Sequence, residues 1–499
     1  MTGHDAFLGL EPAGLWAHFS AIAGIARPSG RESAIADWIA GWAETRGFPV
    51  RRDSVGNICV SVPATEDMPG ARVVALQAHL DMVCVRAENA ASDPAAGQIE
   101  IVHDGEWLAA SHSTLGADNG IGIAAAMSLA ESKVIPHGPL ELLFTVEEET
   151  TAKGADGLDP SLIQADVMLN LDAESSGVLM IGCAGSAWTV LHWPAPREPV
   201  PEDWRAVQIV LSGLRGGHSG LDIGKNRLNA IKGIVSVIRC VSEIVPIRLC
   251  RLEGGDAFNA IPIRALAIIG FPGAMASECA ESIVAAQSHL ATRFSATDPE
   301  LCISQTSMDP RGLKSWSEGD GDRLLDLLSV VPSGVLALER HAPDQVETSN
   351  NVGIVAERGD VIEVHSLARS SVASALEETL ASIESAARLA GAEFTIIPPV
   401  IPPWRVAPDS AAQAVVQEAY RDLFGREPRL VTVHAATESA IILQRIPRLD
   451  IVSLGPEIQH AHMPGERVNI PSVIQFYDLI CEVVMRLASS SVGVGRRGK

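Results

Sequence analysis

The chain has 499 residues, of which 47% are hydrophobic and 20% are charged. This is the composition of an ordinary globular protein with two or three domains, and it excludes a disordered, collagen-like or low-complexity chain. The 38 Lys and Arg against 61 Asp and Glu give a net charge of −23. Because such a body repels phosphate backbones and anionic lipid, we expect neither a nucleic-acid nor a membrane partner.

The start of the chain lacks the features of a secretory signal. No Lys or Arg precedes Arg27, and no apolar run approaches the roughly 18 residues needed to span a bilayer. The eight cysteines are scattered, without a CxxC pair, and lie mostly in apolar segments. This pattern is typical of reduced core residues, so we expect a cytoplasmic protein.

The two ends of the chain predict a single α/β domain. In chain order we expect two helices within 15–47, strands at 57–63 and 72–78, a helix at 119–131, and strands at 139–146, 166–171 and 450–454. Continuous apolar strands that alternate with helices indicate a parallel or mixed sheet covered by helices on both faces.

The middle of the chain has a different pattern. Strands such as VQIVLSGL and DVIEVHSLA are interleaved with amphipathic helices, which predicts an α+β domain, and the proline-rich segment EFTIIPPVIPPWRVAPD predicts the return of the chain. We therefore expect an α/β domain made of residues 1–186 and 398–499, interrupted by an inserted α+β domain at 187–397.

Acids and histidines follow several of the buried strands, and one acid, Asp118, precedes the helix at 119–131. They are His79, Asp81, Asp118, Glu147, Glu148, Glu149, Asp172, His460 and His462. His79 and Asp81 point the same way, because residues two apart on an extended chain share a face. Ligand sites in open α/β sheets lie beyond the carboxyl ends of the strands, so we expect these side chains to meet at one sheet edge.

Two imidazoles with three carboxylates suit two divalent metal ions, with zinc favoured by imidazole and manganese or cobalt as alternatives. Asp118 is the candidate bridging ligand, because a carboxylate has two oxygens and the tight GADNG turn would lock it. His79 and Asp172 would complete one site, and Glu149 with a C-terminal histidine the other. Spacing alone does not decide which histidine after 450–454 is the ligand.

Two further acids suit other roles. Asp81 would hold the far ring nitrogen of His79 and fix its tautomer. Adjacent side chains diverge on an extended chain, so one of Glu148 and Glu149 binds metal and the other, next to a bound water, is a general base. Each residue alone has an ordinary alternative, such as an N-cap at Asp118. Their shared position at strand ends argues against all of these alternatives at once.

The motifs around these residues resemble the metallopeptidase superfamily of dinuclear-zinc aminoacylases, carboxypeptidases and dipeptidases, and within it the cytosolic dipeptidases. They are QAHLDMV at 77–83, TLGADNGIG at 114–122, the Glu148-Glu149 pair, ADVMLNLDAE at 165–174, GCAGS at 182–186, GLRGGHSG at 213–220, FNAIP at 258–262, ETSNNVG at 347–353 and SLGP at 453–456. The resemblance covers nearly the whole chain.

The resemblance implies a zinc-peptidase catalytic domain with an inserted lid domain, and hydrolysis of dipeptides with broad specificity, including the Xaa-His type. It implies that two metal ions, with zinc as the first choice, are bound by His79, Asp118, Glu149, Asp172 and His462, the last selected by its place two residues before Pro464. It also implies that Asp81 orients His79, that Glu148 is the general base, and that the peptide bond after Asp118 is cis.

In the lid, the resemblance implies that His218 supports the scissile carbonyl as an oxyanion. Asn259 and Arg369 would hold the substrate backbone and carboxylate, the arginine through a bidentate contact. Two departures bear on substrate preference: Ile263 and Arg264 replace an arginine that often follows NAIP directly, and the family segment HAGLECG reads HAATESA at 434–440.

An aminoacylase or carboxypeptidase of the same superfamily is the alternative function. A non-catalytic metal-binding relative is disfavoured by the presence of Glu148, since a pure binder needs no base. The inserted domain, about 210 residues long, is large enough to form a dimer interface, so a homodimer is a further expectation. The preferred dipeptide and the native metal stay open.

Overall fold

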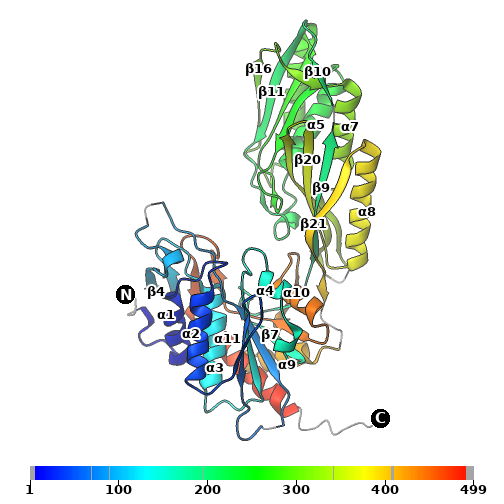
Figure 1. Ribbon diagram of the computed structural model, residues 1–499. Coiled ribbons are helices and arrows are strands. Elements are labelled where there is room, and N and C mark those ends of the chain that lie inside the picture. The colour runs from blue at the N-terminus through cyan, green and yellow to red at the C-terminus, as the bar shows by residue number, and fades with distance from the viewer. Residues whose placement is uncertain are drawn as a thin grey trace, which may run out of the picture. The chain divides into compact units, whose positions relative to one another are not determined.

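The computed structural model describes residues 6–490 except 69, 89, 195, 341 and 406–408. The chain forms two compact units, which we treat separately (Figure 1). The first unit comprises Met1–Gly182, Trp404–Thr432 and Thr437–Lys499, and the second comprises Cys183–Pro403 and Val433–Ala436. The expected junctions at 186/187 and 397/398 lie a few residues from these, whereas the short return of the chain at 433–436 was not expected.

The first unit is built on a nine-stranded sheet. Its main path runs β1 (Val50–Arg52), β2 (Ile58–Val62), β6 (Leu140–Thr145), β3 (Val74–His79), β7 (Val167–Asn170), β24 (Asp450–Ser453), β8 (Val178–Cys183) and β22 (Trp404–Arg405), and β23 (Arg429–Val433) pairs with β8. β3 pairs in parallel with β6 and β7, and β7 pairs in parallel with β24. The carboxyl ends of these four strands therefore meet at one edge.

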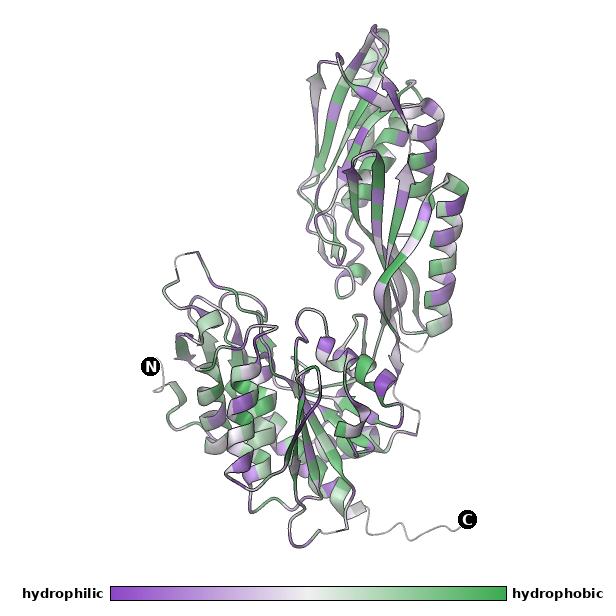
Figure 2. Ribbon diagram, in the orientation of Figure 1, coloured by the Kyte–Doolittle hydropathy of each residue, from purple (hydrophilic) through white to green (hydrophobic). Residues whose placement is uncertain are grey.

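The central strands of this sheet are apolar and buried. Every residue of β3, β6 and β7 is buried, as expected for parallel strands with both faces covered, and Figure 2 shows them as largely hydrophobic. The helices are α1 (Ala13–Ala23), α2 (Ser33–Glu44), α3 (Ala117–Glu131), α4 (Lys153–Asp156), α9 (Ala411–Phe424), α10 (Glu438–Arg445) and α11 (Ile470–Ser490). The helices and strands expected from the sequence in this unit are therefore confirmed.

A small four-stranded sheet in the first unit was not predicted. It has the order β25 (Ile458–Gln459), β26 (Arg467–Asn469), β5 (Trp107–Ala110) and β4 (Ile101–Asp104). β26 pairs with β5, and the amide of Gly465 donates to the carbonyl of Ser113 at 3.0 Å. This sheet therefore ties the segment that carries His462 to the segment that leads into Asp118.

The second unit is an antiparallel sheet with helices, which matches the α+β expectation. Its main path is β16 (Cys302–Met308), β11 (Trp204–Ser212), β15 (Ala265–Pro272), β13 (Arg248–Gly254), β19 (Ala342–Arg358), β20 (Val361–Ser370), β9 (Gly185–Pro194) and β21 (Glu393–Ile401), and β18 (Gly334–Glu339) pairs with β19. The helices are α5 (Ala230–Ser242), α6 (Ala276–Arg293), α7 (Glu318–Val330) and α8 (Ala373–Ala390). The proline-rich segment contributes β21.

Successive side chains of β20 lie on opposite faces of the sheet. Ile362 and Val364 belong to the core that includes Ile383 of α8, and Ala368 packs with Leu376 of the same helix. Residues of β20 with the opposite parity lie on the other face of the sheet. Arg369 is one of them, so its guanidinium lies on the face of the sheet away from α8.

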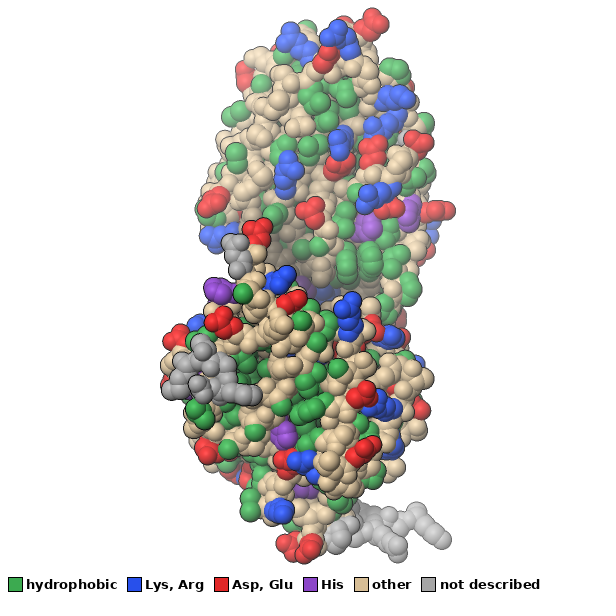
Figure 3. Space-filling view, turned by 60° about the vertical axis from the view of Figure 1, so that its left-hand side comes forward, with side chains coloured by type: hydrophobic (Ala, Val, Ile, Leu, Met, Phe, Trp, Pro, Cys, Tyr) green, Lys and Arg blue, Asp and Glu red, His purple; other side chains and the backbone are tan. Residues whose placement is uncertain are grey.

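The exposed surface carries both kinds of charge. On the face drawn in Figure 3, Asp and Glu side chains are interspersed with Lys and Arg in each unit. Among the described residues, no helix combines the length and the apolar character needed to cross a bilayer.

Candidate active site

The carboxyl end of β3 places His79 among acids. The imidazole is buried, and its Nε2 lies 2.9 Å from Oδ1 of Asp118 and 3.2 Å from Oδ1 of Asp172. Asp172 follows β7, and Asp118 lies in the first turn of α3. The three side chains offer ligand atoms within 4.8 Å of one another, which makes them a group able to hold a metal ion.

Asp118 uses its other oxygen in a second group. Its Oδ2 lies 3.1 Å from Nε2 of His462, and the same nitrogen lies 2.9 Å from Oε2 of Glu149. Asp118, Glu149 and His462 also meet the distance condition for a metal group. One carboxylate is therefore common to both groups, which is the arrangement that a ligand bridging two metal ions requires.

The charges of this cluster perturb its titration. Hydrogen bonds with Asp118 and then Glu149 raise the pKa of His462 to about 11. Burial would raise the pKa of Asp118, but hydrogen bonds with His462 and His79 outweigh it and lower that pKa below its usual range. These shifts reflect the negative charge that surrounds the two imidazoles. A bound metal ion would meet the same carboxylates, and its ligands must be deprotonated.

Asp81 organises the residues around His79. Its Oδ1 lies 3.4 Å from Nδ1 of His79, and the hydroxyl of Ser29 donates to Oδ2 at 2.7 Å. The two carboxylate oxygens also accept the backbone amides of Glu148 and Glu149 at 3.0 and 3.1 Å. Burial alone would raise the pKa of Asp81, yet the contacts with His79 and the other donors lower it to about 2. A permanently ionised Asp81 therefore fixes both the ring and the loop beside it.

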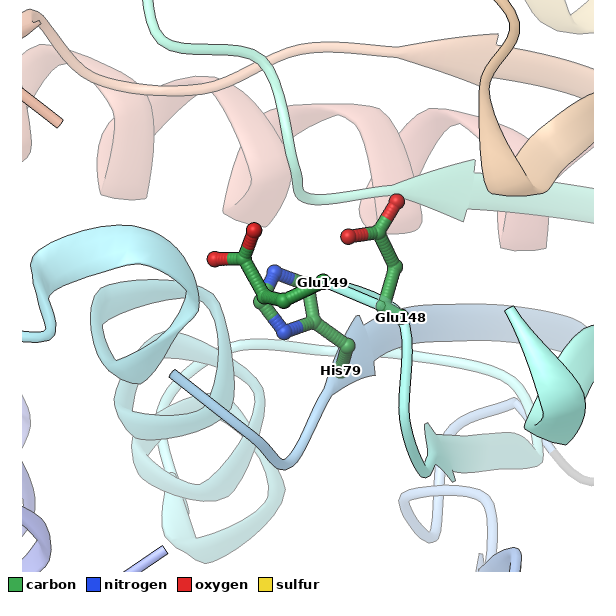
Figure 4. A group of neighbouring side chains, drawn as sticks. All are labelled: His79, Glu148 and Glu149. Carbon is green, nitrogen blue, oxygen red and sulfur yellow. The ribbon is translucent and has the colours of Figure 1, made fainter. Parts of the chain in front are cut away.

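The adjacent glutamates lie closer together than expected, because an oxygen of each and a ring nitrogen of His79 are within 4.8 Å of one another and form a third group that could hold a metal ion. Figure 4 shows both carboxylates near the imidazole of His79 and pointing in different directions. Glu149 contacts His462, whereas burial, followed by the charges of Asp172 and of Glu438 after it, raises the pKa of Glu148 well above its usual range. Glu148 is thus the carboxyl group with the stronger tendency to hold a proton.

Two further features of the structure agree with what the resemblance implies. The peptide bond between Asp118 and Asn119 is cis. Of the two C-terminal histidines, His462 enters a metal-binding group and His460 does not.

The residues present fit divalent metal ions. Imidazole nitrogen and carboxylate oxygen together suit zinc, manganese and cobalt. The buried Oε1 of Glu149 has no hydrogen-bond partner among the described residues. A buried carboxylate oxygen without a donor calls for an explanation, and a cation bound at this cluster would provide one.

Glu466 supports the site and was missed by the sequence analysis. It is 2% exposed, and its carboxylate accepts the backbone amides of Leu115, Gly116, Ala117 and Asp118 at 2.7, 3.0, 2.8 and 3.4 Å. Four amides on one carboxylate fix the turn that presents Asp118. The only signal in the sequence is its position four residues after His462.

Arg27 supports the same turn from the other side and was also missed. Its guanidinium is fully buried and donates to the carbonyls of Leu80, Asp81 and Gly116. The backbone of Gly116 has φ +71°, and a Cβ there would lie 2.5 Å from Nη2 of Arg27. The arginine therefore joins the end of β3 to the start of α3.

His218 lies in the second unit, in the short ribbon of β12 (Gly217–His218) and β14 (Ala260–Ile261). Its Nδ1 accepts the backbone amides of Gly220 and Leu221 at 3.2 and 3.1 Å. The ring proton of the neutral form must therefore sit on Nε2. Burial, and then the charge of Arg369, lower the pKa of His218, so at neutral pH the side chain is an uncharged N–H donor.

Asn259 and Arg369 lie near this histidine. The carbonyl of Asn259 accepts the amide of Ser219 at 2.8 Å. A Cβ placed on Gly220 would lie 3.2 Å from both Nε of Arg369 and Cε1 of His218, so the two side chains are neighbours. Arg369 is 5% exposed and makes no ion pair among the described residues, and burial lowers its pKa to about 10.

The first departure from the family pattern is close to His218. A Cβ on Gly216 would lie 2.3 Å from Cγ2 of Ile263, so this isoleucine lies against the glycine loop that carries His218. Ile263 and Arg264 are both exposed.

Comparisons with known proteins agree with this geometry. The profile of peptidase family M20/M25/M40 matches residues 75–486. The chain is 35% identical over 480 residues to the cytosol non-specific dipeptidase of Escherichia coli (strain K12), covering 96% of this chain and 98% of that protein.

Two solved structures share the fold. The aminoacylhistidine dipeptidase of Vibrio alginolyticus has 34% identity and a TM-score of 0.87, covering 96% of this chain and 98% of that chain. Aminopeptidase PepT of Bacillus cereus has 16% identity and a TM-score of 0.56, covering 96% of this chain and 99% of that chain, and this second likeness concerns the fold alone.

The role of Glu466 can be tested by metal affinity. Glu466→Gln leaves one oxygen for four amides, so the turn that presents Asp118 should loosen and the Kd for Zn²⁺ should rise about 10- to 100-fold, the usual cost of losing a group that orients a ligand. Competition with a chromophoric chelator would measure the Kd. Glu141→Gln is the matched control, because Glu141 is a buried carboxylate that accepts the amides of Gln164 and Ala165 away from the ligands. An equal loss of affinity in both variants would contradict the role.

Proposed function

The chain belongs to peptidase family M20/M25/M40, and from this membership we propose that it is a metallo-dipeptidase with a dinuclear site. The single observation that carries the proposal is the position of Asp118, whose two carboxylate oxygens contact His79 and His462 in two separate groups of ligand atoms. The names of the E. coli and Vibrio relatives support dipeptides, of broad or Xaa-His type, as the substrate class.

Five side chains would hold the metal ions: His79, Asp118, Glu149, Asp172 and His462. Zinc is the first choice for this mixed set of ligands, with manganese or cobalt as alternatives. When bound, such ions supply a polarised scissile carbonyl and a more acidic water molecule.

Glu148 is the proposed general base. Its carboxylate lies beside His79 and Glu149 and is absent from the two groups that contain Asp118, so it is the acid that can be spared from binding the bridged pair of ions. A carboxylate next to a metal-bound water can act as a general base. Glu148 would accept a proton from the attacking water as the water oxygen adds to the carbonyl carbon. It would then donate this proton to the nitrogen of the leaving amine, so that the C–N bond breaks as the carbonyl double bond re-forms.

The second unit would supply groups that recognise the substrate, which is the role expected of a lid. His218 presents an Nε2–H donor that suits a carbonyl oxygen gaining negative charge in the transition state. Asn259 would hold the substrate backbone, and Arg369 its carboxylate. The support for Arg369 is that its charge is buried without an acidic partner.

Two coarser expectations also belong to this proposal. We propose a cytoplasmic location, which the name of the E. coli relative and eight free cysteines support. A homodimer through the second unit stays a prediction.

The substrate class can be tested with a panel of peptides. The protein loaded with Zn²⁺, Mn²⁺ or Co²⁺ should hydrolyse unblocked dipeptides, including Xaa-His, at least about 100-fold faster in kcat/KM than N-acetyl amino acids or longer peptides. Product amino acids would be quantified by chromatography. Preference for N-acyl amino acids would favour the aminoacylase alternative, and release of single C-terminal residues from long peptides the carboxypeptidase alternative.

Substitutions of the two adjacent glutamates should impair different properties of the protein. Glu148→Gln should keep metal content and lower kcat by about 10³-fold or more, because an amide cannot accept the proton. Glu149→Gln should weaken metal binding, because a neutral group replaces a charged ligand. Metal content by mass spectrometry, together with steady-state kinetics, separates the outcomes. Similar metal loss in both variants would rule out this division of roles.

The roles of the second unit separate in kcat and KM. His218→Ala should leave metal content and fold unchanged and lower kcat by about 10²–10³-fold, as for loss of an oxyanion donor. Arg369→Ala should raise KM for a dipeptide and have little effect on the corresponding dipeptide amide, which lacks the carboxylate. Normal kcat in the His218 variant would exclude the oxyanion role while leaving the metal site in place.

A further inference from the structure

His434 is a buried side chain in the second unit that the proposed mechanism does not use. It lies in the short segment Val433–Ala436, which belongs to the second unit although the residues on either side of it belong to the first. The carbonyl of Val433 accepts the amide of Ala184 at 2.8 Å, next to the start of β9. The segment is therefore attached to the second unit by its backbone, and it carries an imidazole there.

The imidazole is held beside Arg369. Its Nε2 lies 2.7 Å from Oγ of Ser349, and Ser349 is directly opposite Arg369 in the pairing of β19 with β20. Directly opposite residues of an antiparallel pair have their side chains on the same face, about 5 Å apart at Cβ. A Cβ on Gly220 would lie 2.1 Å from the carbonyl oxygen of His434 and 3.2 Å from Nε of Arg369. The carbonyl of His434 and the side chains of Arg369 and His218 thus all lie close to Gly220.

Both side chains have unused polar atoms. The Nε of Arg369 and the Nδ1 of His434 are buried and have no hydrogen-bond partner among the described residues. The two side chains are 5% and 8% exposed. A buried polar group left without a partner is costly, and a buried cation more so. Two neighbouring groups of this kind indicate that a bound ligand supplies the missing hydrogen-bond partners.

The chemistry of the pair restricts this ligand. Burial, and then the charge of Arg369, lower the pKa of His434 to about 4, and a hydrogen bond of the ring with the backbone of Val346 opposes this shift only in part. The imidazole is therefore neutral at neutral pH and adds no second positive charge beside the arginine. Nε2 can accept from the hydroxyl of Ser349 or donate to it, and in the tautomer in which it accepts, the ring proton lies on Nδ1. A guanidinium and an N–H donor side by side match the two oxygens of a carboxylate.

We propose that His434 is a substrate-binding residue that, together with Arg369, binds the free carboxylate of the dipeptide through Nδ1. The inference rests on the proposed function, since it assigns a further residue to the same reaction.

The test compares His434→Asn with His434→Gln. The amide of asparagine takes the position of Nδ1, whereas that of glutamine takes the position of Nε2. His434→Ala should raise KM for a dipeptide about 10- to 100-fold, the range for a hydrogen bond to a charged group, with kcat changed less. Asparagine should restore most of this loss and glutamine little. On the dipeptide amide, all three variants should differ from the unmodified protein by no more than about threefold in KM.

A double-mutant cycle separates substrate binding from a merely structural role. With Arg369→Ala, the effect of His434→Ala on the dipeptide should shrink to less than about a third of its value, because both residues bind one carboxylate. His192→Ala is the matched control, because His192 is another histidine of the second unit, on β9, opposite Glu363 in the pairing with β20. It should leave both KM values unchanged.

The outcomes distinguish this inference from the proposed function. Equal KM effects of His434→Ala on the dipeptide and its amide would overturn the carboxylate role, and so would better rescue by glutamine than by asparagine. In either case, wild-type dipeptide hydrolysis that is lost in Glu148→Gln would leave the dipeptidase proposal intact. Absence of dipeptide hydrolysis by the metal-loaded wild-type protein would instead overturn the proposed function.

Discussion

The site depends on one constraint: a single buried carboxylate, that of Asp118, must face two imidazoles at once. Its two oxygens lie 2.9 and 3.1 Å from His79 and His462, which are 383 residues apart in the chain. A flexible aspartate would lose one contact to gain the other. Glu466 and Arg27 prevent this, because both act on the backbone of the turn that carries Asp118 and not on the carboxylate itself. The ligand atoms therefore remain free for a cation.

Two kinds of structure bring these segments together. The parallel strands β3 and β7 end at one edge of the sheet and deliver His79 and Asp172 there. The C-terminal ligand arrives differently, since the pairing of β26 with β5 holds the loop of His462 against the segment before Asp118. Three carboxylates within contact of two histidines would repel one another in water-free surroundings. A cation bound among them would offset this repulsion.

Much of this follows from the sequence, because polar residues at the ends of apolar strands are visible in it. His79, Glu149 and Asp172 were found in that way, Asp118 was found in the GADNG turn before a helix, and the choice of His462 over His460 needed the family motif. Glu466 and Arg27 were not predicted, because their partners are backbone groups, which carry no sequence signal. The small sheet was missed for a related reason: β25 and β26 have two and three residues and lack a hydrophobic period. The second-unit position of His434 depends on tertiary contacts of a four-residue segment.

Asp81 and Glu466 of the first unit differ from Arg369 and His434 of the second in how far their polar atoms have partners among the described residues. In the first unit, Asp81 and Glu466 have donors for both oxygens, and the ligands contact one another. In the second unit, Arg369 and His434 retain buried atoms without partners. Asp81 and Glu466 hold the segments that carry the proposed metal ligands, and their hydrogen bonds are complete within the protein before a metal binds. A group that binds a substrate keeps polar atoms without partners when the substrate is absent, which costs free energy. The unpaired atoms of Arg369 and His434 are what the proposed recognition of a carboxylate requires, and the unpaired Oε1 of Glu149 is what the proposed metal site requires.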